Sequence, residues 1–271
     1  MKEIITSSSN STLKYIKSLQ MKKTRDEYGK FLIEGEKLFL EALDYNVPIS
    51  MVLISQSYAE SSKHQEYAAV LSERNIPLCY ADDKVFKGVC ETDTPQGIIA
   101  VAAKLEYDID SIISKDKLSL ILLHELRDPG NVGTIIRTAD ACGLDSVVIS
   151  KGSADLYNGK TIRATMGSLF HIPVIQGVDT AEIIVKLKQR GVVTIGADPH
   201  SSINCTELPY QRKSAIIIGN ESKGISSGIK EMLDINTTIP MPGRAESLNA
   251  GIAASILMYE LYVRKNATFL I

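Results

Sequence analysis

Leu-Ser-Leu-Ile-Leu-Leu at positions 118–123, followed by His-Glu-Leu-Arg-Asp-Pro-Gly-Asn-Val-Gly at 124–133, decides how the second half of this chain folds. This run, which is apolar apart from Ser119, predicts a strand buried on both faces, as in a parallel sheet. Pro129, Gly130 and Asn131 predict a turn and a helix start, and we expect the helix over 132–142 with Gly143 as its stop signal. A second apolar run at 146–150 completes a predicted β-α-β unit.

The same alternation continues along the chain. It predicts strands at 172–175, 192–197, 215–218 and 237–239, and helices at 158–169, 180–190, 225–233 and 247–264. Two of these strands lead directly into further polar segments, 219–224 and 240–249. Because the carboxyl ends of parallel strands share one edge of a sheet, we expect the three polar segments to meet where α/β folds bind ligands.

The first hundred residues form a separate pattern. Strands are predicted at 31–35, 51–55, 77–80 and 97–103, with helices at 34–45, 61–74 and 82–90 between them. The charge-rich stretch 104–117 separates this pattern from the one downstream. The sequence therefore predicts two α/β domains, 1–105 and 106–271.

Composition limits the function classes. The chain has 271 residues, of which 44% are apolar and 23% charged, as in an ordinary globular protein. No apolar run is long enough to span a membrane and the first residues lack a signal-peptide pattern, so we expect a cytoplasmic protein without membrane contact. The four Cys and four His residues show no metal-ligand spacing, and no metal is expected.

Charge is distributed unevenly. The net charge is −2, yet residues 1–30 contain seven Lys or Arg against three acids, which leaves −6 for the remainder. A basic segment of this kind fits either a nucleic-acid contact or a solvated amphipathic helix, and the sequence leaves both interpretations open.

The polar segments suggest an anion-binding cleft. A helix that starts at Asn131 points its first N–H groups toward a ligand, and Arg137, further along, carries a fork of donors suited to phosphate. Glu221 requires a partner if it is buried, and Arg137 is the candidate for that ion pair. A surface arginine and a solvated acid are the alternatives. No P-loop and no glycine-rich dinucleotide fingerprint is present, which disfavours a dinucleotide enzyme.

The third segment predicts an irregular loop before the last helix. Pro240, Pro242 and Gly243 suit a wall for a flat heterocycle, Ser247 is the expected N-cap, and Asn249 is an unexpected polar group in the first turn of an apolar helix.

Together, the three segments carry a family resemblance. They read Asn-x-Gly-x-x-x-Arg-Thr-Ala from Asn131, Gly-Asn-Glu-x-x-Gly from Gly219, and Ile-Pro-Met-x-Gly-x-x-x-Ser-Leu-Asn-x-x-x-Ala from Ile239. This order resembles the signature motifs of the SpoU (TrmH-like) RNA 2′-O-ribose methyltransferases of the SPOUT superfamily. The resemblance covers about 118–265 and includes the segment from Arg163 to Pro173. Residues 1–105 are similar, more loosely, to the family's ribosomal-protein-like RNA-binding domain.

The resemblance implies a methyltransferase. Its methyl donor would be S-adenosyl-L-methionine, its acceptor a ribose 2′-hydroxyl of RNA, and its catalytic domain a homodimeric SPOUT fold with a trefoil knot and an active site at the subunit interface. By position, backbone at Gly196, Gly219, Ile239 and Leu248 would hold the cofactor, and Asn131, Arg137, Glu221, Ser247 and Asn249 would line the transfer site. The apolar residues Leu248, Ile252, Ile256, Tyr259 and Val263 would serve either the dimer or the core of the subunit.

The resemblance leaves the substrate and one role open. Ribosomal RNA is the expected substrate, and transfer RNA is the alternative substrate. The alternative function is that of an RNA-binding protein without catalysis. A guanidinium does not readily lose a proton. We therefore expect Arg137 to clamp a phosphate and stabilise the developing alkoxide, oriented by Glu221, while a phosphate oxygen or water takes the proton.

Overall fold

The computed structural model describes residues 3–264, apart from the side chains of 62–66 and 264, and it divides into two compact units. The first contains the residues up to Leu105 together with Tyr157–Phe170, and the second contains Glu106–Leu156 and the residues from His171 onward. The break after Leu105 falls where the charge-rich stretch begins. The segment Tyr157–Phe170, which the linear sequence leaves inside the second domain, packs with the first unit.

The first unit is built on a five-stranded mixed sheet in the order β1-β4-β3-β5-β2. Strands β1 (Ile4–Ile5), β4 (Leu78–Ala81) and β3 (Ile49–Ser55) run parallel, whereas β5 (Ile98–Ala103) is antiparallel to both β3 and β2 (Lys30–Glu34). The helices are α1 (Ser11–Ser18), α2 (Lys22–Tyr28), α3 (Glu36–Asp44), α4 (Gln56–Ala59), α5 (Ser62–Glu73) and α6 (Asp83–Lys87).

Apolar residues from α1, α6 and the sheet form one core of this unit. Leu13 and Ile16 of α1 pack with Leu53, Phe86 and Val101. The segment that joins from the second half of the chain forms α9 (Gly159–Thr165) and the short 3-10 turn η1 (Ser168–Phe170). Its attachment includes an aromatic contact between Phe31 and Tyr157, whose ring centroids are 4.6 Å apart.

The second unit contains a six-stranded, entirely parallel sheet in the order β11-β9-β10-β6-β7-β8. The strands are β6 (Leu118–Leu123), β7 (Ser146–Ser150), β8 (Val174–Val178), β9 (Val193–Ala197), β10 (Lys213–Ile218) and β11 (Ile235–Thr237). Most of their Val, Ile and Leu residues are buried, as the apolar runs predict. The α/β class with parallel strands is therefore confirmed.

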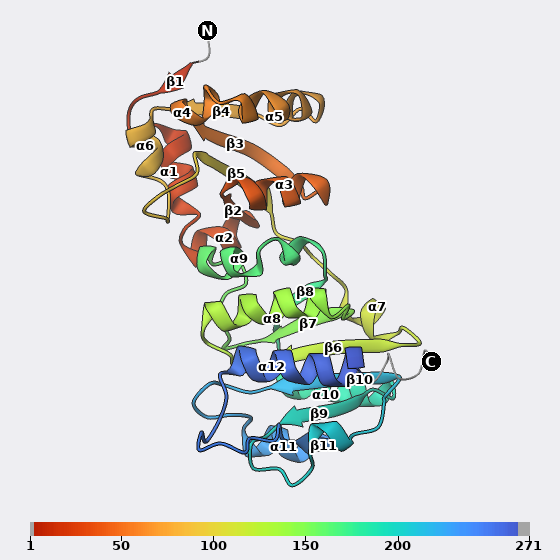
Figure 1. Ribbon diagram of the computed structural model, residues 1–271. Coiled ribbons are helices and arrows are strands. Elements are labelled where there is room, and N and C mark those ends of the chain that lie inside the picture. The colour runs from red at the N-terminus through yellow and green to blue at the C-terminus, as the bar shows by residue number, and fades with distance from the viewer. Residues whose placement is uncertain (1–2, 265–271) are drawn as a thin grey trace. The chain divides into compact units, whose positions relative to one another are not determined.

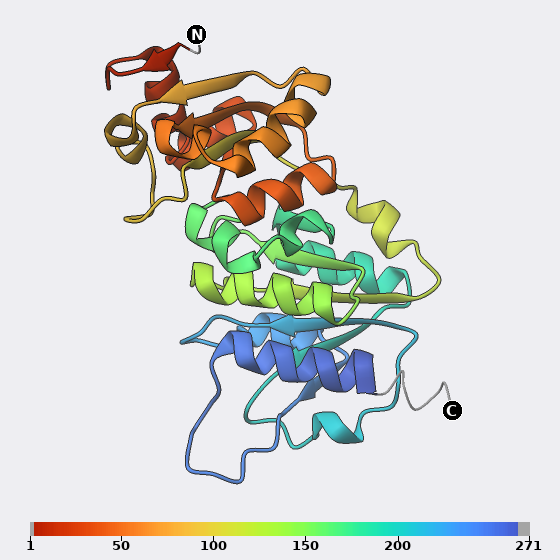
Figure 2. The ribbon, with the colours of Figure 1, turned by 45° about the horizontal axis from the view of Figure 1, so that its top comes forward.

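Helices cover this sheet on both faces (Figures 1 and 2). Alternate residues of β6, such as Leu120 and Leu122, pack with Ile184 and Leu187 of α10 (Thr180–Gln189) and with α7 (Ile109–Ile113). Helices α8 (Pro129–Ala141) and α12 (Ala250–Met258) pack against each other, and α12 continues into a π-helical turn, η3 (Tyr259–Arg264). The remaining helical segments are η2 (Cys205–Glu207) and α11 (Ser227–Met232).

The last helix differs from its sequence prediction. It begins at Ala250 with Asn249 as its N-cap, so the predicted cap at Ser247 is wrong. The stripe with the most regular helical spacing does not enter the core of the subunit: Ile252, Ile256 and Tyr259 are 53%, 39% and 59% exposed. Buried positions are instead Ala254, Leu257, Met258, Leu261 and Tyr262.

Strand β11 also lies slightly earlier than predicted, at Ile235–Thr237, because Thr238 pairs with the segment before η2 instead: its N–H donates to the Ile203 carbonyl oxygen at 2.8 Å. Across residues 3–264, no helix is long and apolar enough to cross a membrane.

A candidate cofactor pocket at the edge of the parallel sheet

The segment after β6 is shaped by its own side chains. Asp128 is the N-cap of α8, and its carboxylate accepts a hydrogen bond of 2.8 Å from the Asn131 backbone N–H. Pro129 occupies the first turn, where its missing N–H costs nothing. The cap satisfies one helix-terminal donor internally and leaves the Asn131 side chain available for other contacts.

The segment after β10 is a tight loop that requires glycine. A Cβ on Gly219 would lie 2.2 Å from the backbone carbon of Gly224, a distance at which the loop cannot close. Backbone hydrogen bonds join Asn220 and Gly224 in both directions, at 3.0 and 2.8 Å. The Asn220 side chain then donates to the Glu125 carbonyl oxygen at 2.8 Å and so ties this loop to the segment after β6.

Glu221 completes the link between the two loops. Its carboxylate accepts hydrogen bonds from the backbone N–H groups of Asp128 (2.8 Å) and Arg127 (3.2 Å) and from the Asn131 amide (3.3 Å). Partial burial alone would raise the pKa of Glu221, but these hydrogen bonds outweigh it and hold the pKa below its ordinary value. The carboxylate is therefore ionised at neutral pH and committed to holding backbone.

Arg137 does not pair with Glu221, so the predicted ion pair is wrong. The guanidinium is exposed on α8, and no hydrogen bond or ion pair to it occurs within residues 3–264. The Glu221 carboxylate binds backbone donors because the N–H groups of Arg127 and Asp128, in the segment after β6, lie directly beside it. Arg137 lies more than two turns further along α8. Arg137 is thus free to meet a ligand or another molecule.

The third segment brings Asn249 close to Asn131. The Asn249 Oδ1 atom caps α12 by accepting from the N–H groups of Gly251 (2.9 Å) and Ile252 (3.2 Å). A Cβ placed on Gly251 would lie 3.2 Å from the Asn249 oxygen and 3.3 Å from the Asn131 oxygen, so both carboxamides flank this glycine. The hydroxyls of Thr138 and Ser255 meet at 3.1 Å further along the same two helices.

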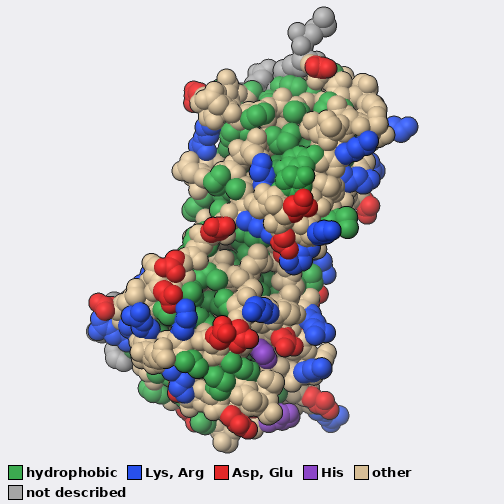
Figure 3. All heavy atoms as spheres, turned by 180° about the vertical axis from the view of Figure 1, so that it is seen from behind, with side chains coloured by type: hydrophobic (Ala, Val, Ile, Leu, Met, Phe, Trp, Pro, Cys, Tyr) green, Lys and Arg blue, Asp and Glu red, His purple; other side chains and the backbone are tan. Residues whose placement is uncertain are grey.

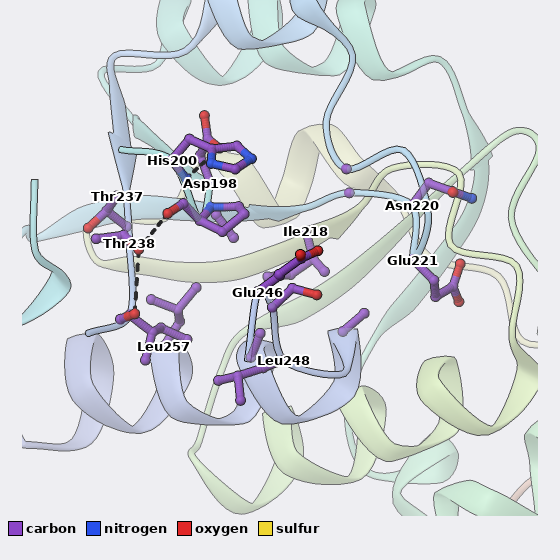
Figure 4. Close-up of a pocket in the computed structure, with 18 of the residues that line it drawn as sticks. Asp198, His200, Ile218, Asn220, Glu221, Thr237, Thr238, Glu246, Leu248 and Leu257 are labelled. Atoms are coloured by element: carbon purple, nitrogen blue, oxygen red, sulfur yellow. Dashed lines mark hydrogen bonds between the residues drawn. The ribbon is translucent and has the colours of Figure 1, made fainter. Parts of the chain in front are cut away.

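A pocket of about 370 Å³ opens where these loops meet the ends of β9, β10 and β11. Figure 4 shows Asp198 and His200 at one end, Asn220 and Glu221 at the other, and Leu248 and Leu257 on the side of the last helix. The predicted meeting of the three polar segments at one sheet edge is thereby confirmed, because all three contribute to this connected site.

Some of the predicted site residues line the pocket and others do not. Gly219, Ile239 and Leu248 line the pocket, as do Glu221 and Ser247 from the predicted transfer site. Gly196 does not line it; a Cβ there would lie 2.5 Å from Leu233 and 2.7 Å from Asn236, so this glycine serves close packing between β9 and its neighbours. Asn131, Arg137 and Asn249 also lie outside the lining, although Asn131 contacts Glu221 directly.

The sequence predictions missed a charged pair in the pocket. Asp198 follows β9, and its carboxylate lies 2.7 Å from the Lys230 ammonium; both residues line the pocket. Burial alone would raise the pKa of Asp198, but Lys230 and the His200 backbone N–H lower it below its ordinary value. A signal for Asp198 existed, since it is the first polar residue after a predicted strand of the same sheet.

Within the described residues, no group of His, Cys, Asp or Glu side chains has the arrangement of a metal site. The fold and the pocket thus define a parallel α/β protein with a cavity at the carboxyl ends of β9, β10 and β11, the edge at which such sheets bind ligands.

The comparisons with known proteins identify the family. Residues 119–259 match the SpoU rRNA Methylase family, and residues 10–100 match the MRM3-like substrate binding domain. The chain belongs to the SpoU rRNA methylase family. This confirms the family and the enzyme class, an RNA 2′-O-methyltransferase, that the three motifs predicted.

The similarity to relatives extends over nearly the whole chain. The 23S rRNA (guanosine(2553)-2′-O)-methyltransferase RlmP of Bacillus subtilis is 38% identical over 95% of this chain and 98% of its own length. The structure of an AdoMet-bound rRNA methyltransferase from Sinorhizobium meliloti has a TM-score of 0.85 and 29% identity over 95% of this chain and 96% of that one. The SpoU methyltransferase AviRb from Streptomyces viridochromogenes has a TM-score of 0.85 and 25% identity, covering 96% and 99% of the two chains.

Proposed function

We propose that the protein transfers the methyl group of S-adenosylmethionine to a ribose 2′-hydroxyl of ribosomal RNA in the cytoplasm. The observation that carries this proposal is the connected site that the three motif segments form: the second and third segments line one pocket, and Glu221 of the second binds the backbone of Asp128 in the first. When bound, S-adenosylmethionine supplies an electrophilic methyl group on a cationic sulfur. The prediction of this cofactor agrees with the AdoMet found in the similar S. meliloti and S. viridochromogenes enzymes.

The pocket residues fit this cofactor. A volume of about 370 Å³ lies in the range of small-molecule sites. Ile218, Leu248 and Leu257 offer apolar surface for an adenine ring, and the Gly219 loop lets backbone approach closely. Carboxylates at Glu221 and Glu246 supply negative charge around a cation, whereas the charge of Asp198 is balanced by Lys230. Gly219, Ile239 and Leu248 are therefore proposed to contact the cofactor, and Gly196 to shape the strand beneath it.

The transfer site is proposed to lie beside Glu221. A ribose hydroxyl is a poor nucleophile at neutral pH, so positioning must provide much of the rate. Asn131 and Asn249 flank Gly251 and would orient the ribose, with Ser247 at the pocket rim. Glu221 is a positioning residue, because its carboxylate is occupied by backbone N–H groups and its lowered pKa makes it a weak base. A phosphate oxygen or water then takes the proton.

Arg137 is proposed to act across a homodimer. Its guanidinium contacts no group of its own pocket among the described residues, yet it lies next to Thr138, which meets α12. The exposed stripe of Ile252, Ile256 and Tyr259 on α12 is apolar surface of the kind that subunits bury. A twofold contact through this stripe would carry Arg137 toward the partner's pocket, where it would clamp a phosphate and stabilise the developing alkoxide.

Two further features are proposed from the family. The C-terminal segment is expected to form a trefoil knot, and the first unit is expected to act as the RNA-binding domain. Support for ribosomal RNA comes from relatives that extend over both units: RlmP, and the 23S rRNA (uridine(2479)-2′-O)-methyltransferase of S. viridochromogenes, which is 28% identical over 87% of this chain.

The experiment is a methyl-transfer assay with S-adenosylmethionine labelled in its methyl group. The acceptors are protein-free ribosomal RNA and transfer RNA from cells that lack the gene. We expect label in ribosomal RNA, at a linkage that resists alkaline hydrolysis because the 2′-oxygen is methylated. Label in transfer RNA alone would establish the alternative substrate. If calorimetry detects no binding of S-adenosylmethionine, the protein is instead an RNA-binding protein without catalysis.

A further inference from the structure

Two exposed aromatic and basic helices form a distinct surface on the first unit. Helices α1 and α2 meet through Tyr15 and Tyr28, whose ring centroids are 5.4 Å apart at an interplanar angle of 79°. Tyr28 is 52% exposed and Met21, at the start of α2, is 66% exposed. A Cβ on Gly29 would have no atom within 4 Å, so open space lies directly beside Tyr28. We call this surface, residues 14–30, the α1–α2 surface.

The charges of this surface are largely uncompensated. The surface contains two acids, Asp26 and Glu27, against six Lys or Arg residues, and Asp26 is already bound by Lys22 and Lys104, each at 2.5 Å. Four other lysines have no ion pair within the part of the chain that the structure describes: Lys14, Lys17, Lys23 and Lys30. Elsewhere several lysines are matched, including Lys115 with Asp145 and Lys188 with Asp234. The face seen in Figure 3 likewise shows basic and acidic side chains interspersed.

The α1–α2 surface is held rigidly. Arg25 is only 3% exposed, and its Nη1 donates to the carbonyl oxygens of Leu19 (2.9 Å) and Gln20 (2.6 Å), which fixes the turn between the helices. The Gln20 amide donates in turn to the Val89 carbonyl oxygen at 2.9 Å. Because these hydrogen bonds fix the backbone that carries the rings and ammonium groups, this backbone loses little conformational entropy when a ligand binds.

We propose that the α1–α2 surface binds single-stranded RNA, with a base stacked on Tyr28 and the backbone phosphates on Lys14, Lys17 and Lys23. Exposed aromatic rings among unpaired lysines suit this ligand, because unpaired bases stack on aromatic side chains and phosphates attract ammonium groups. The inference rests on the proposed function in that the RNA is the methylation substrate. It adds the surface of the first unit that holds this RNA.

The test compares Tyr28→Leu and the triple variant Lys14→Gln, Lys17→Gln, Lys23→Gln with two controls. Tyr45→Leu removes a second tyrosine that is also 52% exposed, and Lys84→Gln removes an exposed lysine of α6. The probe is a short fluorescein-labelled single-stranded RNA, and protein-free ribosomal RNA serves as methyl acceptor. Calorimetry with S-adenosylmethionine monitors the pocket of the second unit, which all four variants should leave unchanged.

We expect Tyr28→Leu to weaken RNA binding about tenfold, the effect of losing one stacked base. The triple variant should reduce the slope of log affinity against log salt by about 0.7 for each lost phosphate contact. Methylation should show a raised KM for RNA with kcat nearly unchanged. If both variants keep the RNA affinity and the salt slope of the wild type, the inference is wrong. It is also wrong if the variants change the oligomeric state and not RNA binding, because the α1–α2 surface would then be a contact between proteins.

The same experiment separates this inference from the proposed function. If the wild type binds S-adenosylmethionine and methylates ribosomal RNA while both variants behave like their controls, only the α1–α2 surface is wrong. If the wild type neither binds the cofactor nor methylates RNA, the proposed function fails. RNA binding that still depended on Tyr28 would then support the surface by itself.

Discussion

The Asp128 backbone N–H donates to the Glu221 carboxylate at 2.8 Å and joins two loops that lie 93 residues apart in the chain. Asp128 caps α8 and Glu221 follows β10, so one carboxylate fixes the start of a helix relative to a neighbouring strand. The geometry of the pocket rim therefore depends on an ionised group, and the protonation of that group can be followed experimentally.

Replacing Glu221 by Gln should change stability in a pH-dependent manner. The folded-state pKa of Glu221 lies below its ordinary value of 4.5, so its carboxylate stabilises the fold above about that pH. This contribution is lost as the pH falls through the folded-state pKa. Urea unfolding of wild type and Glu221→Gln should thus show a clear difference at about pH 7 that shrinks toward about pH 3. A difference independent of pH would mean that the charge is unimportant.

Asn249 should prove to have two separable roles. Asn249→Ala removes the N-cap of α12 and should destabilise the protein by about 1 kcal/mol. Asn249→Asp keeps an oxygen that accepts from Gly251 and Ile252 and should restore the melting temperature. Methyl transfer should remain low in both variants if the carboxamide orients the ribose. Recovery of activity together with stability in Asn249→Asp would reduce Asn249 to a helix cap.

Gly219 should tolerate no side chain, unlike Gly228. Gly219→Ala places a methyl group 2.2 Å from the Gly224 backbone and must open the loop that borders the pocket. We expect at least about tenfold weaker S-adenosylmethionine binding, corresponding to about 1.4 kcal/mol. Gly228 in α11 has free space around its Cβ position, and Gly228→Ala should stabilise the helix by up to about 1 kcal/mol. Calorimetry and thermal unfolding measure both effects.

The exposed stripe of α12 should control the oligomeric state. Ile252→Asp places a charge on a residue that is 53% exposed, so a monomeric protein would tolerate it. If subunits bury this stripe, sedimentation will show dissociation to monomers and methyl transfer will fall with it. Val185→Asp on α10, at a residue 45% exposed, is the matched control and should change neither property. A wild type that sediments as a monomer would refute the proposed dimer.

Mixing two inactive variants should test where Arg137 acts. If Arg137 serves the partner's pocket, a mixed dimer of Arg137→Ala and Glu221→Gln contains one pocket with both groups intact. Random exchange of subunits should then restore roughly a quarter of the wild-type sites. If Arg137 acts within its own subunit, each pocket of the mixed dimer lacks one group, and the mixture will be no more active than its components.

The sequence predicted the parallel sheet well because its signals are local. Runs such as Leu118–Leu123 and Ser146–Ser150 are mainly apolar and bounded by turn residues, and the structure places β6 and β7 at those positions. The meeting of the three motif segments followed from the shared edge of parallel strands. Both inferences need only the chain direction and the length of each apolar run.

The predictions that failed concern contacts between residues that are distant in the sequence, where several groups compete for the same partner. Charge alone suggested Arg137 as the partner of Glu221, but backbone N–H groups at the end of β6 were closer. The last helix is apolar on nearly every side, so spacing could not tell that Leu257 and Met258 are buried while Ile256 is exposed. Segment 157–170 joined the first unit through contacts that no linear boundary reveals.

Tyr262 anchors the end of the last described helix by donating its buried hydroxyl to the carbonyl oxygens of Leu120 and Ser214, each at 3.1 Å. Both acceptors belong to central strands, β6 and β10, that precede it by many residues. Ala250, Ala253 and Leu257 of the same helix wall the pocket. A chain still emerging from the ribosome thus cannot complete this pocket until the last described helix has been synthesised and has docked on the sheet.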